Sequence, residues 1–479
     1  MKKLNVDVAI IGAGSAGMTA YRSALAHTRS VVVIESGPYG TTCARVGCMP
    51  SKLLIAAAEA AHAVEQSHRF GIQVKGREID GQAVMQRVRA ERDRFAGFAV
   101  NAVQAWPEEH RLRGAARFLS PHVLAVDDQA EVHADRIVIA TGSSPIVPSG
   151  WREHLGDRLV INDDVFEWQD LPSSVAVVGA GVIGLELSMA LARLGVRVRL
   201  LGRGGKVGPL TDPDLVGKAR EIVAGALEFS ADARNLDVTR DGDTVVLRFT
   251  EGDAHREERF DYLLVAIGRR SNVDGLDLHN AGIELGAHGI PPVDRYTGRV
   301  GDSHLFIAGD VTDELPLLHE AADDGRIAGD NAGRFPDVRV RPRRAPLTIV
   351  FTDPQIAIAG ESHRTLTERE AEFDTGEASF EDQGRSRVMA RNQGMIRVYG
   401  ERHTGRFLGA EMIGPAAEHI GHLLSWAIQQ QQTVQQMLDS PFYHPVVEEG
   451  VRTALRQLNH RLRMGPVPVE RCLDCGPGG

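Results

Sequence analysis

The stretch VDVAIIGAGSAG, residues 6–17, decides the fold of this 479-residue chain. A β-rich run leads into Gly12, Gly14 and Gly17 in GxGxxG spacing, the helical run MTAYRSALAHT follows, and VVVIE closes the unit at Glu35. The glycines allow a tight turn and a close approach of the backbone to a pyrophosphate at the helix N-terminus, while the acid can accept hydrogen bonds from an adenosine ribose. Strand, glycine turn, helix and acid together predict a dinucleotide-binding unit.

The same unit recurs at residues 175–203, VAVVGAGVIGLELSMALARLGVRVRLLGR, where Gly179, Gly181 and Gly184 repeat the glycine spacing. An internal duplication of this module predicts that the protein binds two dinucleotides. The expected fold class is therefore α/β, with two Rossmann-like dinucleotide-binding domains.

The two units differ at the position of the acidic residue that closes the first one. At the position of Glu35, counted from the third glycine of each motif, the second unit has Gly202, followed by Arg203. A carboxylate for a ribose 2′-hydroxyl is missing there, and a guanidinium is placed to meet a 2′-phosphate, with Arg199 and Lys206 nearby. This pattern predicts a preference for NADP(H) over NAD(H). The alternative is that Arg203 is a solvated loop charge and selectivity is weak.

The segment GTTCARVGCMPSK, residues 40–52, carries Cys43 and Cys48, two of the four cysteines in the chain. On a regular helix their Cα atoms would lie roughly 8.7 Å apart, whereas a disulfide needs about 4.4–6.8 Å. Either the pair never bonds or the backbone is bent, and Gly47 and Pro50 could relieve such a bend. Beside a nucleotide fold the pair favours a redox-active disulfide over two inert thiols or a zinc site, because no second Cys/His pair follows at ligand spacing.

Length and charge limit the other classes of function. A chain of this length suggests roughly three or four domains. The formal net charge of −10 argues against a nucleic-acid partner, and no run approaches the ~18 apolar residues of a membrane span. Asp7 and the glycines interrupt any signal-peptide core, so we expect a cytoplasmic protein in a reducing compartment, where a cysteine pair is more often catalytic than structural.

Two apolar stretches, RIVIATGSSPIVP (136–148) and SHLFIAGDV (303–311), each predict a buried strand that ends in a glycine turn, at Gly142 and at Gly309. Asp310 follows the second turn. An acid at the carboxyl end of a strand can bind a ribityl hydroxyl of a flavin, although such a residue alone would more often cap a helix.

Near the C-terminus, YHPVVEEGVRTALRQLNHRL predicts a helix over 446–463 with Pro445 in its first turn. His444 would lie at the helix entrance and Glu449 in about the first turn. An imidazole paired with a carboxylate is suited to take a thiol proton near neutral pH. The helix would bury an apolar stripe of Val447, Val451, Leu455, Leu458 and Leu462.

Taken together, the chain resembles the flavin-dependent pyridine nucleotide-disulfide oxidoreductases over essentially its whole length, and looks most like the dihydrolipoyl dehydrogenase branch. The resemblance rests on GxGxxG at 12–17, CARVGCMPSK at 43–52, ATG at 140–142, GAGVIGLE at 179–186, IAGD at 307–310 and YHPVVEE at 443–449. It implies an FAD site that includes Gly12, Gly14, Gly17, Glu35, Lys52, Gly142 and Asp310. It implies a site for NADP(H) or NAD(H) that includes Gly179, Gly181, Gly184, Arg203 and Gly268.

The resemblance also implies catalytic roles. Cys48 would face the flavin as a thiolate, and Cys43 would exchange with a small-molecule or lipoyl-bound dithiol or disulfide. Lys52 would sit near flavin N5, held by Glu186. His444, oriented by Glu449, would be the acid/base for the dithiol. In the family each active site is completed by the histidine of the other subunit, which implies a homodimer.

Three features depart from the pattern of this branch. Thr41 stands where a second glycine usually precedes Thr-Cys, and Gly202 stands where most of the branch has an acid. The tail RCLDCGPGG adds a second pair, Cys472 and Cys475. Mercuric reductases and large thioredoxin reductases use such a C-terminal pair as a relay, whereas the alternative is a mobile tail with inert thiols.

Other functions stay open at this point. A glutathione-reductase type of disulfide reductase fits the predicted NADPH preference, but Ser51-Lys52 resembles the lipoyl branch rather than the usual Lys-Lys. A mercuric-reductase-like enzyme fits the tail cysteines, but His444 opposes it. A non-catalytic lipoyl-complex subunit or adhesin would predict damaged motifs, and these motifs are intact.

We predict four segments. Residues 1–150 and 272–342 would form the FAD domain, 151–271 the nicotinamide domain, 343–466 an α+β interface domain that dimerises, and 467–479 a flexible tail. The stretch RPRRAPLTIVFTDPQIAIAG (341–360) would open the interface domain with a strand, and the segments at 394–413 would continue its sheet. Helices are expected over 416–439 and 446–463.

Overall fold

The computed structural model describes residues 2–463. The chain forms two compact units, which are described separately. Within the described residues, the first unit comprises 2–53, 86–146 and 268–343, and the second comprises 54–85, 147–267 and 344–463.

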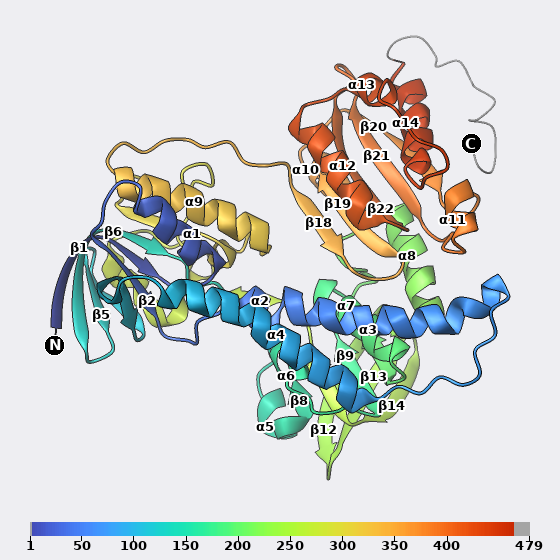
Figure 1. The fold of residues 1–479 in the computed structure, drawn as a ribbon, viewed down its shortest axis with the longest axis horizontal. Coiled ribbons are helices and arrows are strands. Elements are labelled where there is room, and N and C mark those ends of the chain that lie inside the picture. Colours follow the sequence, from blue (N-terminus) through green and yellow to red (C-terminus); the bar gives the residue numbers. More distant parts are fainter. Residues whose placement is uncertain (1, 464–479) are drawn as a thin grey trace. The chain divides into compact units, whose positions relative to one another are not determined.

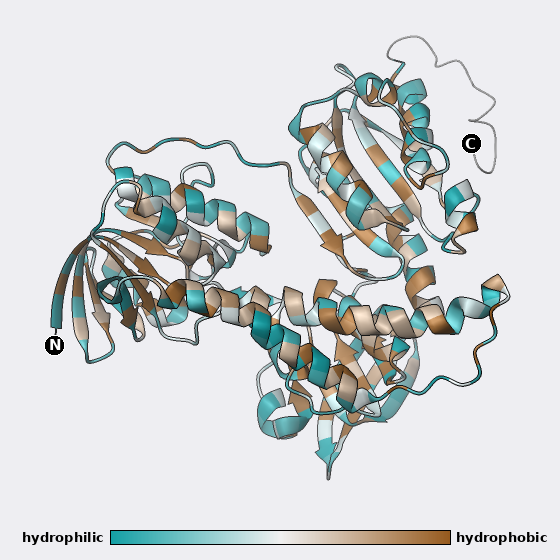
Figure 2. Cartoon of the chain, viewed as in Figure 1, coloured by the Kyte–Doolittle hydropathy of each residue, from teal (hydrophilic) through white to brown (hydrophobic). Residues whose placement is uncertain are grey.

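The first unit is built on a seven-stranded sheet (Figures 1 and 2) with the strand order β3-β2-β1-β6-β5-β4 and with β17 paired to β6. β1 is parallel to β2 on one side and to β6 on the other, so the strands of the first predicted unit are central. The strands are β1 (Lys2–Ile11), β2 (Val31–Glu35), β3 (Arg111–Arg113), β4 (Ala116–Ser120), β5 (Val123–Val126), β6 (Ala130–Ile139) and β17 (Leu305–Ile307), with a separate ladder of β7 (Ser143–Pro145) and β16 (Arg269–Ser271).

Helices α1 (Ser15–Ala24) and α9 (Leu318–Arg334) pack directly on each other beside this sheet (Figure 1). Glycines on α9 make the close approach possible. A Cβ on Gly325 would lie 2.1 Å from the Ala16 carbonyl oxygen, and one on Gly329 would lie 2.2 Å from the Ala20 carbonyl oxygen. The helix that follows the first glycine turn is thus held backbone to backbone by a segment about 300 residues away.

Asp330 ties this helix pair to the segment that follows it. Its carboxylate lies 2.8 Å from His27 Nε2 and accepts hydrogen bonds from Arg334 at 3.2 Å and Arg341 at 2.8 Å. Burial opposes ionisation of this carboxyl, but the hydrogen bonds from Arg341, His27 and Arg334 hold the pKa of Asp330 well below its usual range.

We therefore expect Asp330→Asn to lower the free energy of unfolding by roughly 2 kcal/mol at neutral pH. Because the folded-state pKa is depressed, this stabilisation is present above the unfolded-state pKa of about 4 and is lost as the pH falls further. Urea unfolding should show that the difference in the free energy of unfolding between wild type and mutant becomes smaller from pH 5 to pH 3. The exposed Asp302→Asn serves as control, and a difference independent of pH would contradict the prediction.

The middle part of the second unit holds a five-stranded sheet with the order β11-β10-β9-β15-β8 and a three-stranded antiparallel sheet, β12-β13-β14. β9 is parallel to β10 and to β15, as the second predicted dinucleotide unit requires. The elements are β8 (Leu159–Val160), β9 (Ser174–Val178), β10 (Arg197–Leu201), β11 (Glu228–Ser230), β12 (Ala233–Asp241), β13 (Thr244–Glu251), β14 (Ala254–Phe260), β15 (Tyr262–Val265), α5 (Trp151–Leu155), α6 (Asn162–Val165), α7 (Val182–Arg193) and α8 (Pro213–Ala226).

The C-terminal part of this unit is a five-stranded antiparallel sheet, β18-β19-β22-β21-β20, covered by helices (Figure 1). Its core packs apolar residues of these strands against α12 and α14. The elements are β18 (Leu347–Val350), β19 (Gln355–Gly360), β20 (Phe373–Ser379), β21 (Met395–Glu401), β22 (Phe407–Gly414), α10 (His363–Glu368), α11 (Gly384–Val388), α12 (Ala417–Gln429), α13 (Val434–Leu438) and α14 (Glu449–Leu462).

One helix prediction is wrong in this part, and another is confirmed except at its start. The single helix expected over 416–439 is interrupted, because Gln431 has a φ of +54° and Thr433 forms a β-bridge with Arg406. The glutamine-rich run has no apolar periodicity, so pairing with the sheet determines its path. The helix expected over 446–463 begins only at Glu449. Its predicted apolar stripe, from Val447 to Leu462, is buried as expected.

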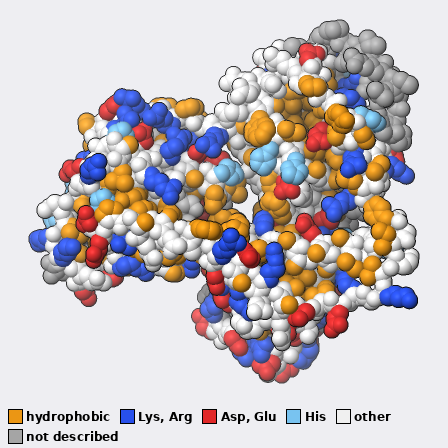
Figure 3. All heavy atoms as spheres, viewed as in Figure 1, with side chains coloured by type: hydrophobic (Ala, Val, Ile, Leu, Met, Phe, Trp, Pro, Cys, Tyr) orange, Lys and Arg blue, Asp and Glu red, His pale blue; other side chains and the backbone are white. Residues whose placement is uncertain are grey.

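The helices α3 (Cys48–Gln66) and α4 (Gly81–Gln104) belong partly to each unit. Among residues 2–463, no helix has the length and apolar character needed to cross a membrane. On the face shown in Figure 3, basic and acidic side chains are interspersed on both units.

Candidate active site

The three glycines of the first motif have different local environments. Gly12 has a φ of +105°, and a Cβ there would lie 2.3 Å from the Ala140 carbonyl oxygen. A Cβ on Gly17 would lie 1.9 Å from the Gly12 carbonyl oxygen, whereas one on Gly14 meets nothing within 4 Å. Two glycines therefore allow close packing of strand, turn and helix, and Gly14 leaves open space in front of the helix N-terminus.

That open space belongs to a cavity of about 470 Å³ within the first unit. Glu35 lies in its wall, where its carboxylate accepts hydrogen bonds from the Ala13 and Gly37 N–H groups, both at 2.7 Å. Gly142, with a φ of +68°, lines the cavity as well. A glycine turn at a helix N-terminus with a carboxylate beside it fits the pyrophosphate and ribose of FAD.

Asp310 follows β17 and begins a short 3₁₀ turn. Its carboxylate accepts a hydrogen bond from the Ser143 hydroxyl at 3.2 Å. Arg269 in turn donates to the Ser143 hydroxyl at 2.8 Å and to the Ser143 carbonyl at 2.7 Å. Burial raises the pKa of Asp310, opposed by Ser143 and by the charge of Arg269. We did not anticipate Ser143 and Arg269 from the sequence, although they directly follow Gly142 and Gly268.

Gly268, assigned above to the nicotinamide dinucleotide, begins the last segment of the first unit. It has a φ of +126°, and its carbonyl accepts a hydrogen bond from the Ile146 N–H at 3.0 Å.

The cysteine pair lies at a break between two helices. α2 (Thr42–Val46) ends before Gly47, whose φ of −127° and ψ of −116° are non-helical, and α3 begins at Cys48. The backbone is therefore bent, and the bend is at Gly47 rather than at Pro50, which lies in the first turn of α3, where proline is tolerated.

Both cysteines are free thiols, with Cys43 half-buried and Cys48 exposed. A hydrogen bond between the two side chains, together with burial, raises the pKa of Cys43, while the charge of Lys52 lowers it. The side-chain hydrogen bond and burial thus both favour the protonated form of Cys43. The Lys52 ammonium donates to the Ser51 hydroxyl at 3.4 Å.

Thr41 caps α2, accepting a hydrogen bond from the Ala44 N–H at 3.2 Å, and has a φ of +55°. A positive φ is strained for a β-branched residue. The position where the family pattern has glycine therefore keeps the backbone conformation that glycine favours.

His444 and Glu449 lie together at the start of α14. His444 Nδ1 is 3.1 Å from Oε1 and 3.2 Å from Oε2 of Glu449. The carboxylate is 2% exposed and also accepts hydrogen bonds from the Val446 N–H at 3.2 Å and from Arg452 at 3.0 Å. The His444 side chain is 45% exposed. Glu449 can hold Nδ1 as a donor and leave Nε2 to exchange a proton.

The second motif repeats the geometry of the first. Gly179 has a φ of +113°, a Cβ on Gly184 would lie 1.8 Å from the Gly179 carbonyl oxygen, and one on Gly181 meets nothing within 4 Å. On α7, Glu186 is buried, and its carboxylate accepts a hydrogen bond from the Phe351 N–H at 2.9 Å. The sequence did not point to Phe351.

Gly202 occupies the structural place of Glu35. The Gly12 N–H donates to the Ile34 carbonyl and the Gly179 N–H to the Leu201 carbonyl, both at 2.8 Å, so the residues that follow are equivalent. Arg203 is exposed.

Arg199, by contrast, forms ion pairs with Glu258 at 2.7 Å and Glu228 at 3.3 Å. The charge of Arg199 is therefore paired with acids on two other strands, β11 and β14.

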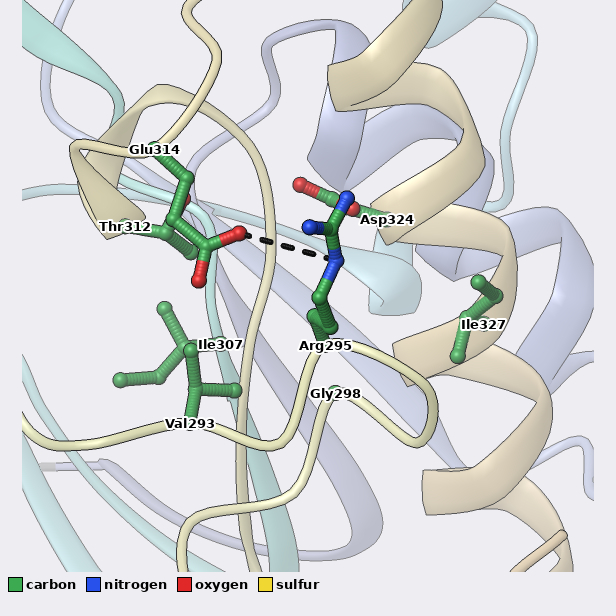
Figure 4. Close-up of a pocket in the computed structure, with 8 residues that line it drawn as sticks. All are labelled: Val293, Arg295, Gly298, Ile307, Thr312, Glu314, Asp324 and Ile327. Atoms are coloured by element: carbon green, nitrogen blue, oxygen red, sulfur yellow. Dashed lines mark ion pairs between the residues drawn. The ribbon is translucent and has the colours of Figure 1, made fainter. Parts of the chain in front are cut away.

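The first unit also has a much smaller cavity, and the described residues hold no cluster of metal ligands. A cavity of about 10 Å³ beside Arg295, Glu314 and Asp324 has room for about one water molecule (Figure 4). Among residues 2–463, no group of three or more His, Cys, Asp or Glu side chains is arranged to hold a metal ion. Cys472 and Cys475 lie outside the described residues.

Comparison with known proteins agrees with this geometry. Residues 6–325 match the family model for pyridine nucleotide-disulphide oxidoreductases, and residues 347–455 match the dimerisation domain of that family, which supports a homodimer. The chain is 32% identical to a mercuric reductase of Streptomyces lividans, covering 92% of this chain and 93% of the relative. It is 29% identical to the dihydrolipoyl dehydrogenase of Bacillus subtilis, covering 94% and 98%.

Among solved structures, LpdA from Mycobacterium tuberculosis superposes with a TM-score of 0.79 at 25% identity, covering 96% of this chain and 100% of that one. The disulfide reductase RclA from Escherichia coli shares the fold, with a TM-score of 0.78 at 23% identity. Members of the matched family are FAD-dependent enzymes that use NAD(P)H. The chain belongs to the pyridine nucleotide-disulfide oxidoreductase family and is a flavoprotein disulfide oxidoreductase.

Proposed function

We propose that this protein is a dihydrolipoyl dehydrogenase, which passes electrons between a lipoyl dithiol and NAD(P)⁺ in a reducing cytosol. The observation that carries the proposal is the pair of His444 and the buried Glu449, because a base fixed at one nitrogen suits removal of a proton from a dithiol substrate. The likeness to the Bacillus subtilis enzyme supports the same substrate class.

In this proposal the residues have separate tasks. His444 Nε2 takes a proton from one substrate thiol, and the resulting thiolate attacks the sulfur of Cys43 in the Cys43–Cys48 disulfide. This attack forms a mixed disulfide with Cys43 and releases Cys48 as a thiolate. The second substrate thiol then gives up its proton, attacks the first substrate sulfur and displaces Cys43, which takes up a proton. The products are oxidised substrate, the Cys43 thiol, the Cys48 thiolate and protonated His444. The first glycine turn, Glu35 and Asp310 would hold FAD, which would supply two-electron transfer chemistry between the cysteine pair and the nicotinamide. His444 serves the cysteine pair of the other subunit, so the dimer is the catalytic unit.

The test is turnover of the purified holoenzyme with a panel of acceptors. Lipoamide reduced with NADPH or NADH, and dihydrolipoamide oxidised in the reverse direction, should give the highest kcat/KM. Preferred turnover of glutathione disulfide would reject the lipoyl assignment in favour of a low-molecular-weight disulfide reductase.

A second candidate is a mercuric-reductase-like activity, favoured by the 32% identity to the Streptomyces lividans enzyme and by the pair Cys472 and Cys475. NADPH oxidation driven by Hg²⁺ that is lost in the double mutant Cys472→Ser/Cys475→Ser, while lipoamide turnover persists, would support this reading. Unchanged activity of the double mutant on every acceptor would make the tail pair inert.

We further propose that the nicotinamide site prefers NADP(H), because Gly202 replaces the acid and Arg203 follows it. Arg203→Gln is expected to lower kcat/KM for NADPH about tenfold, as befits the loss of one charge-assisted contact, and to leave that for NADH within about twofold. Steady-state kinetics with both dinucleotides measures this. A tenfold preference of the wild type for NADH would contradict the proposal.

A further inference from the structure

The segment 202–205, which follows β10, is hydrogen-bonded to the segment 230–233, which follows β11. The Gly202 N–H donates to the Ser230 carbonyl at 2.8 Å, and the Gly202 carbonyl accepts from the Ala233 N–H at 2.9 Å. These bonds continue the sheet beyond its strands and hold the two segments side by side. Residues of both segments therefore lie at the carboxyl ends of adjacent parallel strands, where a Rossmann unit meets the adenosine ribose.

Asp232 connects the two segments through its side chain. One carboxylate oxygen accepts a hydrogen bond from the Gly204 N–H at 2.8 Å. The other accepts two from Arg234, from Nε at 2.9 Å and from Nη2 at 2.6 Å. The Gly204 N–H, then Arg234, and then the charge of Arg203 hold the pKa of Asp232 below its usual range. One ionised acid thus holds both the Gly204 N–H and the Arg234 guanidinium beside the turn that follows β10.

Gly202 keeps this place open for a phosphate. A Cβ at Gly202 would lie 2.8 Å from the Ala231 carbonyl oxygen, so the adjoining segment disfavours a side chain where the first unit has Glu35. A ribose-binding acid is therefore absent at this position for a steric reason as well.

We propose that Arg234 is the second guanidinium, with Arg203, that binds the 2′-phosphate of NADP(H), and that Asp232 positions it. This inference rests on the NADP(H) preference proposed above. A guanidinium has five N–H donors, and Arg234 uses Nε and Nη2 toward Asp232, so the Nη1 end can bind phosphate oxygens. The Arg234 side chain is 72% exposed, which leaves it accessible to a ligand in solution.

Calorimetric titration of the FAD-loaded dimer with adenosine 2′,5′-bisphosphate and with adenosine 5′-monophosphate tests the inference, since the two probes differ only in the 2′-phosphate. Arg234→Gln should weaken bisphosphate binding about tenfold and change monophosphate binding less than about twofold. Arg234→Lys keeps the positive charge but loses the planar, two-pronged guanidinium, and should therefore give an intermediate affinity for the bisphosphate.

Arg259→Gln is the matched control. Arg259 is an exposed arginine of the same three-stranded sheet and pairs with Asp241 at 2.8 Å. Asp241 is at the far end of β12, about 20 Å from Arg234 by the rise of a strand. This variant should leave both affinities unchanged.

Each outcome decides one proposal or both. If Arg203→Gln weakens binding of the bisphosphate and Arg234→Gln does not, the inference about Arg234 is wrong and the proposed NADP(H) preference stands. If Arg234→Gln weakens both probes equally, Arg234 supports the turn without binding the phosphate, which also overturns the inference. If the wild type does not distinguish the two probes, both proposals fail.

Discussion

Replacement of Cys48 with serine is expected to lower turnover of every disulfide acceptor by at least about a thousandfold. The reason is stoichiometric, because a single sulfur cannot form the intramolecular disulfide that stores two electrons. Cys43→Ser should be equally inactive with disulfides. The measurement is NADPH oxidation with lipoamide and with glutathione disulfide, using FAD-loaded protein.

The two cysteine variants should differ in a spectroscopic property. In the proposed mechanism Cys48 is the thiolate that faces the flavin, and the raised pKa of Cys43 agrees with that assignment. Cys43→Ser should therefore keep a thiolate beside the flavin, and Cys48→Ser should not. A long-wavelength absorbance band is therefore expected in Cys43→Ser alone. Reduction of ferricyanide by NADPH, which needs no disulfide, is the control that both proteins bind FAD and the dinucleotide. Survival of the band in Cys48→Ser would reverse the two assignments.

His444→Gln is expected to lower kcat/KM for dihydrolipoamide by about 10²–10⁴, the usual contribution of a general base. The loss should shrink as the pH is raised, because the substrate thiol then ionises without help. The pH dependence of kcat/KM checks this, and a uniform loss at all pH values would argue for a binding role. His460→Gln, an exposed histidine on the same helix, is the control and should retain full activity.

Glu449→Gln should have a smaller effect, roughly tenfold to a hundredfold. An amide oxygen can still accept from His444 Nδ1, but the charge that stabilises the protonated imidazole is lost. Because Arg452 also donates to this carboxylate, the thermal midpoint of the variant needs to be measured beside its activity. Loss of activity in step with loss of folded protein would show that Glu449 serves stability rather than catalysis.

Much of the candidate site could be predicted from the sequence, because its motifs depend on residues only a few positions apart. The two glycine motifs predict their own turns, since a positive φ at Gly12 and Gly179 and the close packing of Gly17 and Gly184 depend on neighbours a few residues away. The short spacing of His444 and Glu449 likewise predicts their contact. The apolar stripe of α14 follows from helical periodicity.

Local signals were misleading or insufficient where a distant segment decides the structure. The glutamine-rich run within 416–439 has helix-forming residues, but a β-bridge between Arg406 and Thr433 interrupts it. Arg199 is close in sequence to Gly202, yet it pairs with Glu258 and Glu228 on two other strands.

By itself, the sequence determined the family-defining parts of this protein: two dinucleotide units, a CxxxxC pair and a histidine–glutamate pair. Only the tertiary structure decided how these parts are completed. It placed the bend at Gly47, connected Asp310 to Ser143 and Arg269, and brought Asp232 and Arg234 beside the turn at Gly202. The difference lies in how far apart along the chain the interacting residues are. Glycine spacing and helical periodicity encode conformation within one element, whereas charge pairing depends on packing between elements that are far apart in the chain.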